Sequence, residues 1–136
     1  MSPQDPARRA VFSDVLTQLT EQVPNVAHAV AMSADGLLLA CTPRLDRDQA
    51  DKLCAAVAGA VSLARSTADF LQAGEHLYSM VAMRDGVLVV QPTPDGSALA
   101  ALAPEMADAG LLAFHLADLA QRIGQQLAPG LRAGVR

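Results

Sequence analysis

Three Asp-Gly pairs, each standing between two apolar runs, constrain the fold of this 136-residue sequence more than any other feature. The pairs occupy positions 35–36, 85–86 and 95–96. Asp-Gly supplies the positive φ angles of a tight turn, and a tight turn joins two antiparallel strands. The apolar runs therefore predict five strands, at residues 26–32, 37–42, 76–83, 87–90 and 97–103. We expect one hairpin and, further along the chain, a meander of antiparallel strands.

Two helices are predicted near the ends of the chain. Asp5 and Pro6 form an N-cap and first-turn pair, and apolar residues then recur at helical spacing until Pro24. The last helix is expected to be capped by Asp108 and to end before Pro129. With a long helix between the two groups of strands, the predicted order is αββαβββα.

Several of the predicted strands are apolar on both faces, and residues 87–90 have no polar position at all. A sheet with one face in water would alternate apolar and polar residues. Helices must therefore cover both faces, which predicts an α+β fold: a three-layer α/β/α sandwich around a five-stranded antiparallel sheet. No repeat or low-complexity linker divides the chain. We expect a single domain at residues 7–128, with an N-terminal tail at 1–6 and a C-terminal tail at 129–136.

The long middle helix carries more apolar surface than one contact needs. It is predicted from about 46–48 to Ala73, with Gly74 at its end. One apolar facet contains Leu53, Val57, Ala60, Val61, Ala64 and Leu71, and an adjoining facet contains Ala56, Gly59, Leu63 and Phe70. A helix that covers one sheet normally shows an apolar stripe a little over ~100° wide, and this surface is roughly twice as wide.

The length of this helix leads to the same conclusion. About 27 residues rise ~40 Å, whereas five strands make a sheet only ~20 Å wide. The helix is expected to overhang its own sheet and to bury its second facet against a copy of itself in a two-fold dimer. Small residues such as Ala56 and Gly59 would let two such helices approach closely. The alternative is that the first or the last helix covers the second facet within one chain.

Composition argues against several functions. The net charge is −4 and the ten Lys and Arg residues are scattered, so nucleic acid is an unsuitable partner. No apolar run approaches the roughly 20 residues that span a bilayer, and the N-terminus lacks a secretory apolar core. A cytoplasmic protein without membrane insertion is expected.

No set of residues predicts catalysis, a cofactor or a metal site. His28, His76 and His115 do not stand at ligand spacing from one another, and Cys41 and Cys54 are expected to be buried, reduced thiols. The glycines mark turns and caps, and the sequence contains no phosphate-binding loop. An enzyme is not predicted.

Residues 26–40, with the sequence Val-Ala-His-Ala-Val-Ala-Met-Ser-Ala-Asp-Gly-Leu-Leu-Leu-Ala, resemble the first hairpin of the Roadblock/dynein light chain family. The Ala-rich helix after 46–48, the hairpin at 85–90 and Ala-Gly-Leu-Leu at 109–112 extend this resemblance over nearly the whole chain, from about residue 11 to residue 127. The chain is most similar to actinobacterial members, whose genes commonly stand beside those for a sensor-kinase-like protein and a Ras-like GTPase.

The resemblance implies a Roadblock/profilin-like fold and a dimer in which the second helices pair and the third strands join two sheets. Applied to this chain, the predicted dimer interface contains Ala56, Gly59, Leu63 and Phe70 of the long helix, with Tyr78 and Met80 near the two-fold axis. The family offers no catalytic residue set to carry over.

We therefore expect a non-enzymatic homodimeric scaffold or regulator that binds a small Ras-like GTPase, an associated sensor-kinase-like signalling complex, or both. Arg44 and Arg47 flank the start of the long helix, where they could contact a partner's phosphates or simply be solvated charges. The alternative function is a small-molecule sensor of related fold, which a buried pocket of roughly several hundred Å³ would favour. An enzyme subunit with a site completed across the dimer would require titratable groups that converge at the interface.

Overall fold

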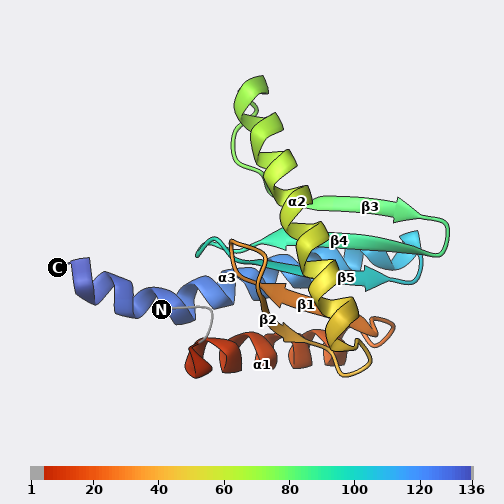
Figure 1. Ribbon diagram of the computed structural model, residues 1–136, viewed down its shortest axis with the longest axis horizontal. Coiled ribbons are helices and arrows are strands. Elements are labelled where there is room, and N and C mark those ends of the chain that lie inside the picture. The colour runs from red at the N-terminus through yellow and green to blue at the C-terminus, as the bar shows by residue number, and fades with distance from the viewer. Residues whose placement is uncertain (1–4, 136) are drawn as a thin grey trace.

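The computed structural model describes the backbone of residues 5–135 and the side chains of residues 5–127. Its elements follow the predicted order αββαβββα (Figure 1). They are α1 (Pro6–Gln22), β1 (His28–Met32), β2 (Leu38–Cys41), α2 (Arg47–Leu71), β3 (Ser79–Met83), β4 (Gly86–Pro92), β5 (Ala98–Ala103) and α3 (Met106–Val135). The predicted α+β class with a five-stranded antiparallel sheet is confirmed.

The strands are arranged in the order β2-β1-β5-β4-β3, and every neighbouring pair is antiparallel. The turns at Gly36 and Gly96 use the positive φ angles expected of Asp-Gly, at 81° and 90°. Gly86 differs, because it begins β4 without a positive φ and a Cβ there would lie 2.9 Å from Leu102 Cδ1. The second Asp-Gly pair therefore needs its glycine for close packing between strands rather than for the turn.

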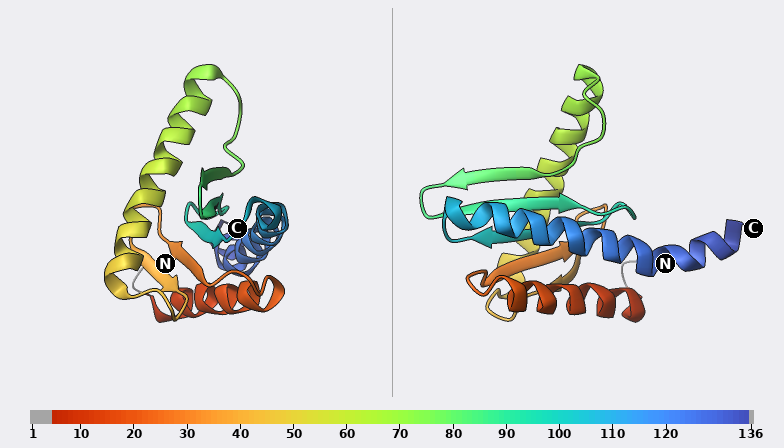
Figure 2. Two further views of the ribbon diagram at one scale, coloured as in Figure 1. Left: turned by 90° about the vertical axis from the view of Figure 1, so that its right-hand side faces the viewer. Right: turned by 180° about the vertical axis from the view of Figure 1, so that it is seen from behind.

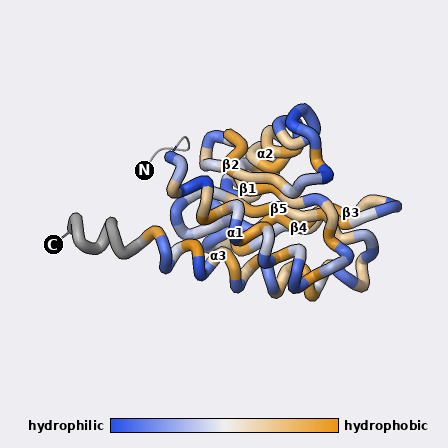
Figure 3. The backbone as a smooth tube through the Cα atoms, turned by 90° about the horizontal axis from the view of Figure 1, so that it is seen from below, coloured by the Kyte–Doolittle hydropathy of each residue, from blue (hydrophilic) through white to orange (hydrophobic). Residues whose placement is uncertain are grey.

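Helices cover both faces of the sheet, as predicted. α1 and α3 lie on one face and α2 lies on the other (Figure 2). Successive residues of β1 alternate between two cores: Ala29 and Ala31 face α1 and α3, whereas Val30 and Met32 face α2. This alternation explains why the strands are apolar on both faces. In Figure 3 much of the tube along β1 and β5 has the colour of hydrophobic residues.

α2 extends beyond the sheet, as its length predicts (Figure 1). Its buried residues Ala50, Cys54, Val57 and Val61 lie in its first part, where it packs on β1 and β2 and reaches β3 and β4. Both α1 and α3 belong to the core on the opposite face of the sheet. Neither helix covers the second apolar facet of α2, so this alternative is wrong.

The end of α2 and the start of β3 differ from the prediction. α2 ends at Leu71, and Gln72 takes the left-handed conformation with φ 53°, so Gly74 is not the capping residue. β3 begins at Ser79 rather than at residue 76. The end of α2 lies away from the sheet, and residues 72–78 connect it to β3 (Figure 1). These residues are extended over that distance, so they are not available for a longer β3.

The terminal helices show one correct and two wrong boundaries. Asp5 caps α1 as predicted, while residues 1–4 of the predicted tail lie outside the described part of the chain. α3 begins at Met106, before the predicted cap Asp108, because the Asp108 amide already donates to a carbonyl three residues earlier, at 3.0 Å. α3 also continues past Pro129 to Val135. A proline removes one helical hydrogen bond, and here it does not end the helix.

Candidate interaction surfaces

Most of the exposed large hydrophobic side chains lie on the free part of α2, which follows its last buried residue, Val61, and on the segment from α2 through β3. We call this region the α2–β3 surface; its large side chains are Leu63, Phe70, Leu71, Leu77, Tyr78, Met80, Val81 and Met83. Phe70 and Leu63 are 76% and 70% exposed. Soluble monomers rarely leave large contiguous apolar patches in water. The surface is therefore the leading candidate for a protein contact.

β3 contributes an open strand edge to this surface. It pairs with β4 on one side and stands last in the sheet order, so its other side has no strand beside it in the described chain. Met80 and Ala82 pair with Val89 and Val87, and paired residues of antiparallel strands point to the same face, here the face of α1 and α3. β3 carries no charged residue that would oppose pairing with another strand.

The six residues predicted for the dimer interface all lie on or beside this surface. Ala56, Gly59, Leu63 and Phe70 are exposed on α2, and Tyr78 and Met80 are exposed at the start of β3. A Cβ built at Gly59 would meet no atom within 4 Å. α2 also contacts β3, while Met80 points to the face of the sheet opposite α2. Their role in a dimer stays a prediction.

Arg44 and Arg47 lie at the other end of α2. Both are exposed, and the Arg47 guanidinium donates to both carboxylate oxygens of Asp51 at 3.0 and 3.1 Å. An exposed pair of this i,i+4 type contributes only about 0.3–0.5 kcal/mol, so it does not prevent Arg47 from reaching another anion. Contact of either arginine with a partner stays a prediction.

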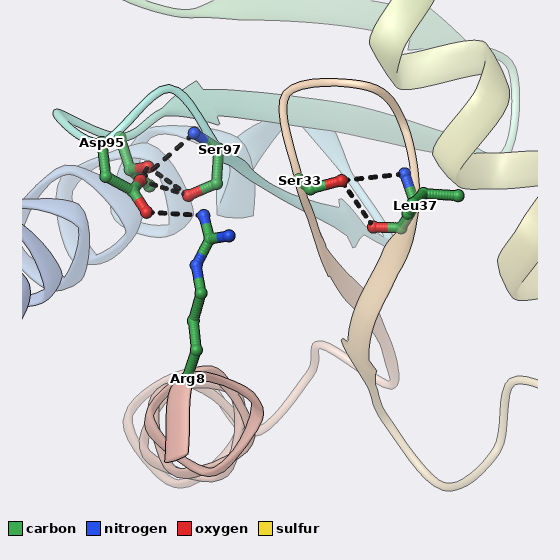
Figure 4. Close-up of polar contacts among 6 residues, drawn as sticks. Arg8, Ser33, Leu37, Asp95 and Ser97 are labelled. Carbon is green, nitrogen blue, oxygen red and sulfur yellow. Dashed lines mark hydrogen bonds and ion pairs between the residues drawn. The ribbon is translucent and has the colours of Figure 1, made fainter. Parts of the chain in front are cut away.

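A partly buried ion pair that the sequence did not reveal joins α1 to the turn between β4 and β5 (Figure 4). Arg8 Nη2 donates to Asp95 Oδ2 at 2.8 Å, and the two side chains are only 9% and 15% exposed. Asp95 also accepts hydrogen bonds from the Ser97 amide at 3.2 Å and from the hydroxyls of Ser97 and Thr93.

The protonation of Asp95 follows from these contacts. Burial by itself raises the pKa of the carboxyl, but the hydrogen bonds from Ser97 and Thr93, followed by that from Arg8, outweigh it and lower the pKa below its ordinary value. Asp95 therefore stays ionised and fixes the start of α1 against the sheet. The sequence marks Asp95 only as a turn residue.

Cys54 is buried as predicted, whereas Cys41 is only half-buried. Cys41 and Cys54 are free, and burial, with smaller contributions from Asp51 and Cys41, raises the pKa of Cys54 to about 11. His76 Nε2 lies 2.7 Å from Ser79 Oγ, where it holds the start of β3. Across the described residues, no group of three or more His, Cys, Asp or Glu side chains is placed to hold a metal ion.

Two open grooves lie beside α2. The larger, of about 660 Å³, is lined by the polar side chains Arg65, Glu75, His76, Tyr78, Gln91 and Gln121, together with apolar residues of α3. The smaller, of about 260 Å³, lies between α2 and the two neighbouring strand turns. Both are open at the surface, with Met32, Val61 and Ala98 of one core lining the smaller groove and Ala120 of the other core lining the larger. Separately, none of the helices in the described part of the chain combines the length and apolarity that crossing a membrane requires.

An antiparallel sheet with two helices on one face and one overhanging helix on the other defines a Roadblock/profilin-like α+β module. The sequence profile of the Roadblock/LC7 domain matches residues 12–103. The chain belongs to the Roadblock/LC7 domain family, whose members are regulators or adaptors. No curated protein matches the chain in sequence.

Solved structures agree with this assignment. A Roadblock/LC7 domain from Streptomyces avermitilis is 32% identical, with a TM-score of 0.77 over 85% of this chain and 96% of that one. MglB of Myxococcus xanthus has a TM-score of 0.74 at 15% identity, over 88% of this chain and 91% of that one. LokiProfilin1, in its complex with rabbit actin, has a TM-score of 0.55 at 15% identity, over 93% and 100% of the two chains. The last two likenesses concern the fold alone.

Proposed function

We propose that this protein is a cytoplasmic, homodimeric scaffold or regulator that binds a small Ras-like GTPase, an associated sensor-kinase-like signalling complex, or both. The α2–β3 surface is the observation that carries the proposal. It exposes eight large hydrophobic side chains on one region of a small domain. The Ras-like partner follows from the resemblance to actinobacterial Roadblock proteins.

The dimer would use both parts of the α2–β3 surface. Two β3 strands that pair antiparallel about a two-fold axis would satisfy the free edges and join two sheets into one. α2 contacts β3 in each chain, so the same axis would bring the two α2 helices near each other. Ala56 and Gly59 would lie where these helices approach, while Leu63 and Phe70 would be removed from water.

Light scattering of the purified full chain tests the dimer. Leu63→Asp adds a charge to an exposed side chain that is not part of either core, so the variant should fold but weaken the dimer by about 100-fold, as expected for a central apolar contact. Ser62→Asp is the matched control, because it adds the same charge on the neighbouring exposed position. A monomeric wild type at micromolar concentration would overturn the dimer.

The GTPase partner is tested with a Ras-like protein sought beside this gene, where the resemblance to actinobacterial members implies one. Binding should be measured in both the GDP and the GTP-analogue states, together with the rate of nucleotide hydrolysis. Arg44→Ala with Arg47→Ala should weaken binding if these side chains contact the partner's phosphates, and Arg9→Ala on α1 serves as a control for loss of positive charge. Absence of binding in both nucleotide states would overturn this partner and leave the dimer untouched.

A small-molecule sensor is the second candidate. The groove of about 660 Å³ favours it, since Arg65, His76, Tyr78 and Gln121 line its walls and Gln91 Nε2 donates to the Leu77 carbonyl at 3.0 Å beside it. Its open, polar shape differs from the enclosed apolar pocket typical of such sensors. Thermal-shift screening with small anionic metabolites would support the sensor if a ligand raises the melting temperature of the wild type but not that of His76→Ala.

A further inference from the structure

The smaller groove, of about 260 Å³, lies between α2 and two strand turns at one end of the sheet. Met32, Val61 and Ala98, which are buried in the core beneath α2, form its floor. Met32 ends β1 and Ala98 begins β5, and these two residues pair across the sheet. Ala34 and Gly96 line the groove from the two turns, and a Cβ at Gly96 would lie 3.8 Å from Ala34 Cβ. The turns therefore meet and form one continuous wall.

α2 forms the facing wall with four exposed polar side chains, Ser62, Arg65, Ser66 and Asp69. These positions are three or four residues apart, so they lie along one side of the helix. The residues predicted for the dimer interface, at 56, 59, 63 and 70, lie on a different side of α2. A dimer formed through the α2–β3 surface would therefore leave this groove open.

The two charged side chains of this wall have no partner in the described part of the chain. Arg65 and Asp69 are four residues apart with the arginine first, as are Arg47 and Asp51, which pair at 3.0 Å. The pairs 48–52 and 118–122, at the same spacing, also form ion pairs. Among the described residues, however, the Arg65 and Asp69 side chains form neither an ion pair nor a hydrogen bond. Both charges are therefore available to a ligand.

These charges determine which ligand the groove would accept. Asp69 would repel a simple anion attracted by Arg65, and Arg65 would repel a simple cation attracted by Asp69. A ligand that carries both charges satisfies both side chains, because its carboxylate accepts from the guanidinium and its ammonium group donates to the Asp69 carboxylate. The Ser62 and Ser66 hydroxyls, which have no hydrogen bond to other described residues, can donate or accept beside them.

We propose that the smaller groove binds a free α-amino acid, with its carboxylate on Arg65, its ammonium group on Asp69 and an aliphatic side chain on the floor of buried residues. An α-amino acid carries its two charged groups on one carbon atom, so both can meet side chains that are one helical turn apart. Pockets for drug-sized ligands measure about 300–1,000 Å³, so a groove of about 260 Å³ favours a smaller molecule. The site is independent of the proposed dimer, and of the residues lining the larger groove it shares only Arg65.

Nuclear magnetic resonance titration of the ¹⁵N-labelled full chain with L-alanine, L-valine and L-leucine tests the proposal. At least one of them should bind, with a Kd on the order of 1 mM because the groove is open to water. Valinamide lacks the carboxylate and N-acetylvaline lacks the ammonium group, so each should bind at least about 10-fold more weakly than L-valine, as expected when a hydrogen bond between charged groups is lost.

Substitutions at exposed positions, which should leave the fold intact, locate the site. Arg65→Gln and Asp69→Asn each remove one charge from the groove and should each weaken amino-acid binding about 10-fold or more. Arg47→Gln and Asp51→Asn remove the same charges from the same helix outside the groove and should bind as wild type. His76→Ala changes only the larger groove and should also bind as wild type.

Three outcomes would overturn the proposal. The first is that none of the three amino acids shifts a resonance at concentrations well above 1 mM. The second is that Asp69→Asn binds them as wild type does. The third is that His76→Ala abolishes binding, which would place the ligand in the larger groove. Light scattering of Asp69→Asn should match wild type in every case, so failure of this proposal is distinguishable from failure of the dimer.

Discussion

Replacing Asp95 by alanine should lower the free energy of unfolding by about 3 kcal/mol. The carboxylate holds the Arg8 guanidinium at 2.8 Å, and the Arg8 side chain is only 9% exposed, so the variant leaves a positive charge without its partner. Removing one member of a buried pair costs about 3–5 kcal/mol. The Thr93 and Ser97 hydroxyls still bond to each other, and Asp95 itself is 15% exposed. Water can therefore reach the site in the variant, which favours the lower end of the range.

Urea unfolding followed by circular dichroism measures this loss. At an m-value of about 1.5 kcal/mol/M, typical of a domain of this size, 3 kcal/mol moves the midpoint by about 2 M. Asp118→Ala is the matched control, because it removes the carboxylate of the Asp118–Arg122 pair, whose side chains are 44% and 51% exposed. That variant should lose no more than about 0.5 kcal/mol. All variants must be compared at one protein concentration, since association adds to apparent stability.

The stability difference should also depend on pH in a defined direction. Hydrogen bonds to Asp95 lower the pKa of its carboxyl in the folded state. The unfolded state then takes up protons first as the pH falls, so the stabilisation is fully present above the unfolded pKa of about 3.9 and disappears as the pH drops through the lower folded value. The difference in free energy of unfolding between wild type and Asp95→Ala should be constant from neutral pH to about pH 5 and should decrease below about pH 4. Equal losses for the Asp95 and Asp118 variants at neutral pH would refute the reasoning.

Three further perturbations test other parts of the structure. Val57→Ala, in the core beneath α2, should lower stability by about 2 kcal/mol in the same urea assay; a loss below about 0.5 kcal/mol would contradict the packing of α2 on the sheet. Gly36→Ala should cost about 1–2 kcal/mol, because φ is 81° and the new Cβ would lie 3.1 Å from Ala58 Cβ; thermal melting that matches wild type would argue against that turn. At pH 8 a thiol reagent should modify Cys54 far more slowly in the native protein than in urea, since the thiol is buried and its pKa is about 11, and equal rates by mass spectrometry would contradict its burial.

The parts of the fold that sequence predicted are those set by local chemistry or by periodicity. The two turns at Gly36 and Gly96 need positive φ angles, and the Asp-Gly pairs indicated them directly. The two-sided apolar strands required helices on both faces, and the length of α2 required an overhang. The start of β3 was mistaken because His76 and Leu77 are compatible with a strand, yet they are needed to bridge the distance from the end of α2.

The polar contacts of Asp95 could not be predicted from the sequence, because no local sequence pattern encodes them. Arg8 and Asp95 are 87 positions apart, and only the packing of α1 beside the turn between β4 and β5 brings them together. The same limit applies to the interface. Leu63 and Phe70 were selected as a second apolar facet from helical spacing, and they are exposed, but a single chain cannot reveal the molecule that would cover them.

The glycines of this chain differ in whether packing within the domain requires them. At Gly86 and Gly124 an added Cβ would lie 2.9 Å from Leu102 Cδ1 and 2.8 Å from Pro94 Cγ, so a larger residue would force Leu102 or Pro94 to shift. At Gly59 and Gly110 the same Cβ would meet nothing within 4 Å, although both positions lie inside helices, where alanine is more stable by about 1 kcal/mol. Close approach of a second molecule, as proposed for α2, would account for a glycine that costs stability and is not required within the domain. Gly59 lies among the exposed apolar residues of α2 that the proposed dimer uses, and Gly110 lies near the exposed Leu111 and Phe114 of α3.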